Sequence, residues 1–283
     1  MAYTGLAPAQ RRSARLVGGG FLAALVAGVI LVSLWGGLSL GMLWLGTASA
    51  AAAWIYRRFL RLLPMNRPGD GGQIYGDLGA ANRITLLRGG LVALLAGFAL
   101  VPWPRMTAGG VPWPWIPGML YGAAVLLDGV DGRIARKTGC VTRMGEQLDM
   151  ETDALGLLAA SMVAVIADRL PPAYLVAGMA YYLFSAGIRF REFLGKPVQE
   201  VRPWRGAKII AGFQMAFVAL ALLPPVSPKA AAIAAWMVMI PLLAGFGRDW
   251  MIVCGQAGND CFAGFRCRPE DRLVDRETGD RKP

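Results

Sequence analysis

Apolar residues along the chain gather into eight segments, which shorter polar stretches separate. The segments cover residues 17–35, 38–56, 84–103, 114–130, 153–168, 172–188, 208–224 and 230–247. Several approach the ~20 residues that an α-helix needs to cross a bilayer, and the shorter ones can extend by a turn into their polar flanks. The pattern therefore predicts an all-α, polytopic membrane helical bundle.

The overall composition strengthens this prediction. Of the 283 residues, 55% are hydrophobic and only 17% are charged, and the mean hydropathy is +0.47. A soluble domain of this length carries more charge and fewer apolar residues. The chain is therefore expected to be an integral membrane protein.

The basic residues alternate between the two sides of the predicted bundle. If the N-terminus is cytoplasmic, all but three of the 29 Lys and Arg residues fall in cytoplasmic segments, and the exceptions are Arg105, Arg169 and Lys229. Because Lys and Arg accumulate in cytoplasmic loops, we expect both termini on the cytoplasmic side of an inner membrane. The net charge of +11 follows from this topology and from attraction to anionic lipid headgroups, so no nucleic-acid partner is expected.

One polar stretch between two apolar segments is rich in carboxylates. Residues 128–153 read DGVDGRIARKTGCVTRMGEQLDMETD and place four aspartates at the ends of two predicted spans: Asp128, Asp131, Asp149 and Asp153. An ionisable group at such a position is costly unless it is paired, hydrated or metal-bound, so it indicates a functional site. We expect both the stretch and its aspartates to face the cytoplasm.

Helical spacing brings these residues onto two faces. With ~100° between successive residues, one face carries Asp128, Asp131, Gly132, Ala135 and Arg136. On the next helix, Gly145, Asp149 and Asp153 are four residues apart and line up in the same way. Because consecutive spanning helices run antiparallel, the two acidic faces are predicted to meet.

The type of ligand limits the chemistry. The chain has no histidine, which excludes Ser-His-Asp and Cys-His nucleophilic mechanisms. Carboxylate oxygens without histidine or cysteine favour Mg²⁺ or Mn²⁺, and four carboxylates suffice for two such ions in a phosphoryl displacement. The small residues Gly132, Ala135 and Gly145 would let a substrate approach the helix backbones, and the guanidinium of Arg136 can hold a phosphate.

The complete motif resembles the signature of a known family. The pattern D-x2-D-G-x2-A-R-x8-G-x3-D-x3-D runs from Asp128 to Asp153 and is similar to that of the CDP-alcohol phosphotransferases. The segment ANRITLLR at 81–88 is similar to the P-N-x-I-T segment of the same family, with Ala81 in place of the proline. The resemblance covers residues 80–250 and includes six predicted spans.

The resemblance implies a membrane enzyme that transfers a substituted phosphate from a CDP-linked lipid to a hydroxyl group and releases CMP. It implies that Asp128, Asp131 and Asp149 hold two divalent metal ions, and that Asp153 completes the metal site and takes the proton of the acceptor hydroxyl. The implied nucleotide-binding residues are Asn82, Thr85, Gly132, Ala135, Arg136 and Gly145. The family resemblance also implies a homodimer.

The acceptor alcohol is open at this stage. Residues 189–214 form a basic segment on the same predicted side, and the acceptor-binding candidates in it are Arg189, Arg191, Arg205 and Lys208. These residues fit ordinary positive-inside charge, and they also fit a pocket for an acceptor that already carries phosphate, such as glycerol 3-phosphate or an inositol phosphate. Lys208 and Gln214 match part of the G-K-x-K-T-x-x-Q segment of phosphatidylglycerophosphate synthases, but Ile210 and Ala211 depart from it.

Two alternatives to a transfer from CDP-diacylglycerol also fit an apolar chain with carboxylates at the ends of its spans. An aminoalcohol-type transferase would join CDP-choline or CDP-ethanolamine to diacylglycerol. An ion or proton transporter would also carry intramembrane carboxylates, but distributed along a path near the midplane of the bilayer. Here the acidic residues gather at one surface, which favours the transferase.

The chain is predicted to have four parts. Residues 1–56 hold two additional N-terminal transmembrane helices, residues 57–80 an interfacial helix and linker, residues 81–250 the phosphotransferase core, and residues 251–283 a cytoplasmic tail. The first two spans contain no ionisable residue between Leu16 and Tyr56. We therefore expect a chain that begins near Pro64 to retain the catalytic site.

Overall fold

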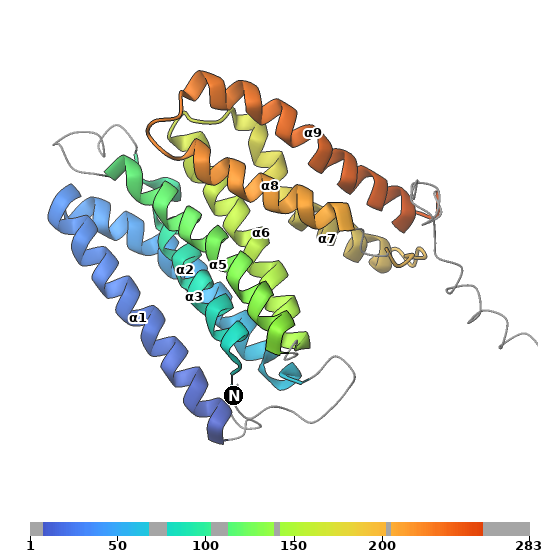
Figure 1. Cartoon of the computed structure of the whole chain (residues 1–283), viewed down its shortest axis with the longest axis horizontal. Coiled ribbons are helices and arrows are strands. Elements are labelled where there is room, and N and C mark those ends of the chain that lie inside the picture. The colour runs from blue at the N-terminus through green and yellow to red at the C-terminus, as the bar shows by residue number, and fades with distance from the viewer. Residues whose placement is uncertain (1–7, 68–77, 103–112, 139–141, 202–204, 257–283) are drawn as a thin grey trace, which may run out of the picture.

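A computed structural model describes residues 8–67, 78–102, 113–138, 142–201 and 205–256 (Figure 1). Side chains of residues 131–138 and of residues 113 and 205 are outside the description. The C-terminal tail, predicted to be a cytoplasmic extension, lies almost wholly outside the described residues.

Within these ranges the chain folds as eight α-helices joined by short connections, and the described residues form no strand. The helices are α1 (Pro8–Gly36), α2 (Leu38–Leu62), α3 (Ala80–Ala96), α5 (Ile116–Thr138), α6 (Arg143–Ile166), α7 (Leu175–Phe193), α8 (Arg205–Ala221) and α9 (Pro228–Val253). Short 3₁₀ turns accompany them: η1 (Leu63–Met65), η2 (Gly97–Leu100), η3 (Trp113–Trp115) and η4 (Pro172–Tyr174). Each apolar segment of the sequence overlaps one helix, which confirms the all-α prediction.

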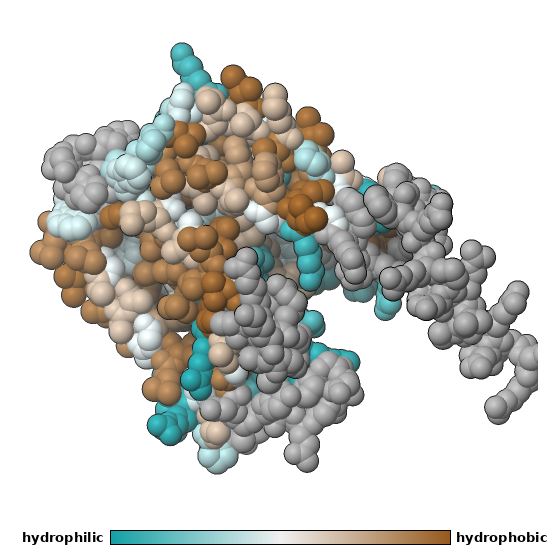
Figure 2. Space-filling view, viewed as in Figure 1, coloured by the Kyte–Doolittle hydropathy of each residue, from teal (hydrophilic) through white to brown (hydrophobic). Residues whose placement is uncertain are grey.

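Among the described residues, four stretches of helix are long and apolar enough to cross a bilayer. They are Pro8–Gly36, Leu38–Met65, Ala80–Leu100 and Pro228–Val253, and the apolar parts of α5 and α8 are shorter, at Ile116–Val130 and Gly206–Ala221. In Figure 2 apolar side chains cover much of the surface in view, and strongly hydrophilic ones form smaller groups. These features support an integral membrane protein, as predicted.

The two N-terminal helices form a hairpin with an inner and an outer member. The chain turns at Gly37, whose φ of 85° is readily adopted by glycine. In the most apolar 18-residue stretch of α1, only 6% is buried inside the protein. The corresponding stretch of α2 is 39% buried. Helix α2 is therefore the one that joins the hairpin to the rest of the bundle.

Helix α2 packs closely on α3. Trp44 is 2% exposed and lies directly over Gly97, where a Cβ atom would come within 2.2 Å of its indole nitrogen. Further along, Ile55 packs on Gly89, and the Thr47 hydroxyl donates a hydrogen bond of 3.0 Å to the Gly97 carbonyl. The hairpin is thus packed into the core of the bundle, which argues against the expectation that a chain beginning near Pro64 retains the catalytic site.

The interfacial helix predicted after residue 56 is not a separate element. Helix α2 continues without a break to Leu62, because Phe59 and Leu62 extend its buried stripe of apolar residues and are 0% and 4% exposed. Residues 63–65 then form the turn η1, and the linker residues 68–77 lie outside the described residues. The basic residues of this stretch therefore belong to the last turns of α2.

Helices α3, α5 and α6 pack against one another near the middle of the bundle, and α8 and α9 lie beyond them (Figure 1). Hydrogen bonds hold the C-terminal end of helix α8, because the Arg169 guanidinium donates to the carbonyls of Ala221 and Leu223. Deeper in the same helix, Gln214 is fully buried, accepts from the Tyr174 hydroxyl and donates to the Val238 carbonyl. Gln214 therefore serves packing between helices rather than the acidic site.

Candidate functional site

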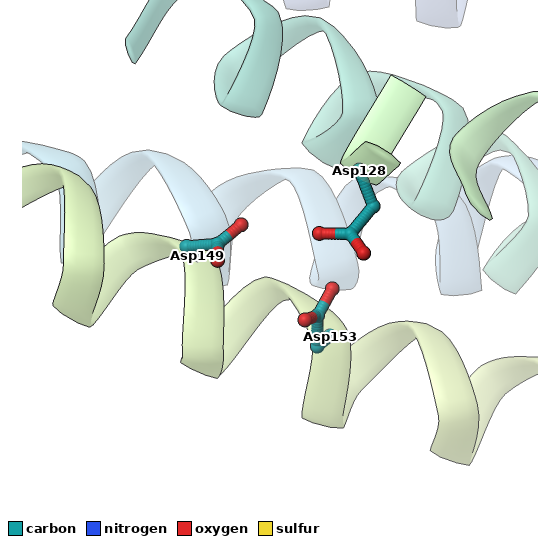
Figure 3. Close-up of side chains that lie close together, drawn as sticks. All are labelled: Asp128, Asp149 and Asp153. Carbon is teal, nitrogen blue, oxygen red and sulfur yellow. The ribbon is translucent and has the colours of Figure 1, made fainter. Parts of the chain in front are cut away.

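Three of the four predicted aspartates converge between α5 and α6. One carboxylate oxygen from each of Asp128, Asp149 and Asp153 lies within 4.8 Å of the others. Figure 3 shows Asp149 and Asp153 one turn apart on α6, with Asp128 pointing toward them from α5. Their side chains are 35%, 38% and 30% exposed, so a ligand can reach them.

The start of α6 is fixed by a side-chain cap. Thr142 is the N-cap residue, and its hydroxyl oxygen accepts a hydrogen bond of 3.0 Å from the backbone N–H of Gly145. Such a cap satisfies one of the N–H groups that the first turn of a helix leaves without an intrahelical partner. Asp149 and Asp153 follow on the same face one and two turns later, because residues four apart are neighbours on a helix surface.

A buried arginine from α3 lies among the three carboxylates. The Arg88 side chain is only 1% exposed, and its Nη1 donates to Asp128 at 2.6 Å. Its Nη2 contacts Asp153 at 2.9 Å and also bonds the carboxylate of Asp149. One guanidinium thus joins the aspartates of both helices to α3.

The charge of this site suits a divalent cation. Arg88 neutralises the charge of only one carboxylate of the three, so the described part of the site remains negative. All its ligands are hard oxygen donors, the type preferred by Mg²⁺ and Mn²⁺. The residues therefore fit the expected metal site. The backbone of Asp131 lies one turn after Asp128 on α5, and its side chain lies outside the described residues.

Asn82 and Gly145, both predicted to bind nucleotide, touch each other at the edge of this site. The Asn82 amide donates to Asn66 and to Thr142, at 3.2 Å in each case. A Cβ atom at Gly145 would lie 2.4 Å from the Asn82 side-chain oxygen, so glycine is required for α3 and α6 to approach this closely. The sequence motifs at 81–88 and 128–153 are therefore parts of one site.

The other predicted nucleotide residues lie on the helices that frame the acidic cluster. Thr85 is 4% exposed and its hydroxyl donates to the Ala81 carbonyl one turn earlier. Gly132, Ala135 and Arg136 lie on α5, and their side-chain surroundings are outside the description. The face that they present and their contacts with a nucleotide stay a prediction.

The predicted acceptor-binding residues differ in their surroundings. Arg191, in the last turn of α7, donates to the Pro197 carbonyl and to the Cys254 sulfur at the end of α9, so it has a structural role. Arg189 is exposed. Lys208, on α8, is exposed. The side chain of Arg205 lies outside the described residues.

The sequence did not identify Arg88 as a site residue. It was counted only among the basic residues that set the orientation in the membrane. A signal was present, because Arg88 follows Asn82 and Thr85 at intervals of three residues and so shares their side of the helix. An arginine within an apolar segment also indicates function or pairing. The pairing of Arg58 on α2 with Glu151 on α6 was missed as well.

The fold and the site define a class: a polytopic α-helical protein with an acidic, oxygen-lined site between helices. Comparison with known families agrees and is more specific. The family model for CDP-alcohol phosphatidyltransferase matches residues 78–245, which is more than half of the chain. The chain belongs to this family.

Two curated relatives match shorter stretches. One is the CDP-diacylglycerol–glycerol-3-phosphate 3-phosphatidyltransferase of Bacillus subtilis, 35% identical over 100 residues, which are 34% of this chain and 51% of the relative. The other is the CDP-diacylglycerol–serine O-phosphatidyltransferase of Mycobacterium leprae, 45% identical over 51 residues, which are 18% of this chain and 17% of the relative. The chain thus matches about half of one relative and less of the other, and their printed acceptors differ.

Proposed function

We propose that the chain is an integral-membrane transferase that moves a phosphatidyl group from CDP-diacylglycerol to the hydroxyl of a small alcohol. The acceptor oxygen forms a new bond to the phosphorus that carries the lipid, and the bond from that phosphorus to CMP breaks. The hydroxyl proton passes to a carboxylate of the protein. Family membership supports this class of reaction.

The observation that carries the proposal is the meeting of Asp128, Asp149 and Asp153 around the buried Arg88. Together with Asp131 these carboxylates would hold two Mg²⁺ or Mn²⁺ ions. When bound, such ions neutralise the diphosphate and the departing CMP, so the leaving group needs little help from an acid. The guanidinium of Arg88 adds positive charge at the same place.

We assign proton removal to Asp153. A general base must come within hydrogen-bond reach of the hydroxyl it deprotonates, and the partly exposed Asp153 carboxylate is open to an acceptor. Asn82, Thr85 and Gly145 would bind the nucleotide from α3 and α6, and Gly132, Ala135 and Arg136 from α5.

The acceptor is proposed from charge. A phosphorylated alcohol brings about two negative charges to a site that already holds a diphosphate, so it needs cationic partners beyond the metal ions. The candidates are Lys208 and Arg189, which are both exposed, and Arg205 at the start of α8. We therefore favour glycerol 3-phosphate or an inositol phosphate.

An acceptor panel tests this assignment. Purified protein, CDP-diacylglycerol and Mg²⁺ or Mn²⁺ are offered glycerol 3-phosphate, inositol phosphate, inositol or serine, and CMP release is followed. We expect turnover with a phosphorylated alcohol and a higher acceptor KM in Lys208→Ala. Turnover with serine or free inositol alone would reject the phosphorylated acceptor, and activity only with CDP-choline or CDP-ethanolamine and diacylglycerol would reject the donor.

Each aspartate is expected to be necessary for turnover. Asp128→Asn, Asp131→Asn and Asp149→Asn should lose metal-dependent nucleotide binding as well as CMP release. Asp153→Asn should keep more nucleotide binding than turnover, because its main task is proton removal. Full activity in EDTA, or in any one of the four variants, would contradict a metal-dependent mechanism.

We further propose that the acidic site and both termini face the cytoplasm and that the protein forms a homodimer. The first proposal rests on the distribution of Lys and Arg and the second on family resemblance. Light scattering of the purified protein, corrected for bound detergent, measures the oligomeric state.

A further inference from the structure

Between the two site aspartates of α6 lies an acidic residue that faces the other way. Glu151 follows Asp149 by two residues and precedes Asp153 by two, which places it about 200° around the helix from each. It is 5% exposed, whereas the two aspartates are open to a ligand. Its carboxylate therefore lies inside the bundle, on the face of α6 opposite the site.

The partner of this buried carboxylate comes from the N-terminal hairpin. Arg58 on α2 donates from Nε to one oxygen of Glu151 and from Nη2 to the other. A paired contact of this kind fixes the direction as well as the distance between the two groups. Gln147, one turn earlier on α6, also donates to Glu151, at 3.4 Å.

Helix α6 is thus held by arginines on opposite faces. Arg88 of α3 binds Asp149 and Asp153 on one face, and Arg58 of α2 binds Glu151 on the other. A rotation of α6 about its axis would stretch the Arg58–Glu151 contact and would also move the two aspartates relative to Asp128. The position of the site carboxylates is therefore coupled to α2.

We propose that Arg58 is a positioning residue for the acidic site, and that the N-terminal hairpin sets the rotation of α6 through the Arg58–Glu151 pair. This inference rests on the proposed role of Asp149 and Asp153 in holding divalent ions. It gives α2 a function in the chemistry although α2 contributes no residue to the acidic cluster itself. Such an ion pair adds little net stability, but the bidentate contact of a guanidinium with a carboxylate restricts the geometry of both groups.

The decisive variant removes both charges. Arg58→Gln alone leaves the Glu151 carboxylate buried without its guanidinium, and the chain could fail to fold for that reason. The double variant Arg58→Gln/Glu151→Gln leaves no uncompensated charge and retains side chains of similar size. The double variant therefore tests the effect of the pair on the site apart from its effect on folding. A thermal midpoint measured in detergent checks that this variant is folded.

The measurement is binding of Mn²⁺, followed by electron paramagnetic resonance, because it does not depend on turnover. We expect the double variant to bind Mn²⁺ about 10-fold more weakly than the unchanged protein, the lower end of the effect seen when groups that orient metal ligands are removed. Arg58→Lys, which keeps the charge but not the paired contact, should fall between the two. The exchange Arg58→Glu/Glu151→Arg should recover part of the affinity.

Two control variants test the loss of a neighbouring arginine and the loss of another contact of α2. Arg57→Gln removes a positive charge from the adjacent, exposed position of α2, and Thr47→Val removes the hydrogen bond between α2 and Gly97 far from the acidic cluster. Both should leave the Mn²⁺ affinity unchanged. Unchanged Mn²⁺ affinity in the double variant, or an equal loss in Arg57→Gln, would overturn the proposal.

Failure of the proposed function gives a different result. If the unchanged protein binds Mn²⁺ but releases no CMP with any donor and acceptor, the transferase assignment fails, and the Mn²⁺ series still decides the role of Arg58. If the unchanged protein does not bind Mn²⁺ at all, the metal site and the inference are both overturned.

Discussion

At the scale of single residues, the site depends on the guanidinium of Arg88 and on glycine, which has no side chain, at position 145. Arg88 contacts carboxylates from two helices while being almost completely buried, and Gly145 lets the Asn82 side chain approach the first turn of α6. Each role depends on a single position of the chain, so a single substitution tests it.

Replacing Arg88 by lysine is expected to impair turnover although the charge is kept. An ammonium group cannot bridge Asp128, Asp149 and Asp153 with the planar fork of a guanidinium. Loss of one charge-assisted contact of about 2 kcal/mol corresponds to a ~30-fold decrease in kcat/KM. CMP release measures the effect, and Arg83→Lys, at an exposed position of the same helix, is the control. Equal activities of the two variants would contradict a role for Arg88 in the site.

Replacing Gly145 by alanine is expected to destabilise the contact between α3 and α6. The added methyl group would lie 2.4 Å from the Asn82 oxygen, and such overpacking costs about 1–3 kcal/mol. The thermal midpoint in detergent should therefore fall. Gly122→Ala in α5 is the matched control, because no atom lies within 4 Å of its added Cβ and alanine favours a helix over glycine. Equal midpoints for the two variants would show that the close approach can relax without cost.

At the scale of elements, α2 is the helix whose role differs most from our expectation. Its apolar residues include a buried stripe at helical spacing, among them Trp44, Ile55 and Phe59, and this stripe packs on the rest of the bundle. Helix α1 instead packs mainly on α2 and is exposed along most of its length. A chain beginning near Pro64 would uncover the stripe, and we now expect it to lose the site.

The large indole of Trp44 provides a test of this packing. Trp44→Ala removes a side chain that is 2% exposed and fills the space over Gly28 and Gly97, which should cost about 3–5 kcal/mol. The thermal midpoint should fall well below that of Trp236→Ala, where the indole on α9 is 50% exposed. A similar midpoint in both variants would mean that the hairpin contributes little to the stability of the bundle.

At the scale of the whole molecule, the two ends of the bundle are distinguished by charge. The acidic cluster, the end of α7 and the start of α8 all lie on the side predicted to face the cytoplasm. Lys229, in the first turn of α9 next to the α8–α9 connection, lies on the opposite side. With this orientation, water-soluble acceptors would reach the site from the cytoplasm.

Cysteine labelling checks the orientation. In a variant with Cys140, Cys254, Cys261 and Cys267 changed to serine, Lys196→Cys and Lys229→Cys each introduce one thiol at an exposed position. A membrane-impermeant maleimide should label Lys229→Cys in intact cells and Lys196→Cys only after the membrane is opened. The reverse pattern would invert the topology and place the site outside.

The sequence alone determined the helices and most of the acidic site. Apolar segments and helical spacing are local properties, so they predicted the eight helices and brought Asp128, Asp149 and Asp153 together correctly. The end of α2 was predicted wrongly, because a basic amphipathic stretch fits an interfacial helix and the last turns of a longer one equally well. Only packing against the bundle distinguishes the two.

Contacts between distant residues were decided by the tertiary structure. Arg88 lies 40 residues from Asp128, and Arg58 lies 93 residues from Glu151, so no local periodicity relates the members of either pair. Each arginine is ordinary topological charge when read along the chain. It becomes a site residue or a positioning residue only because folding brings a carboxylate of another helix next to it.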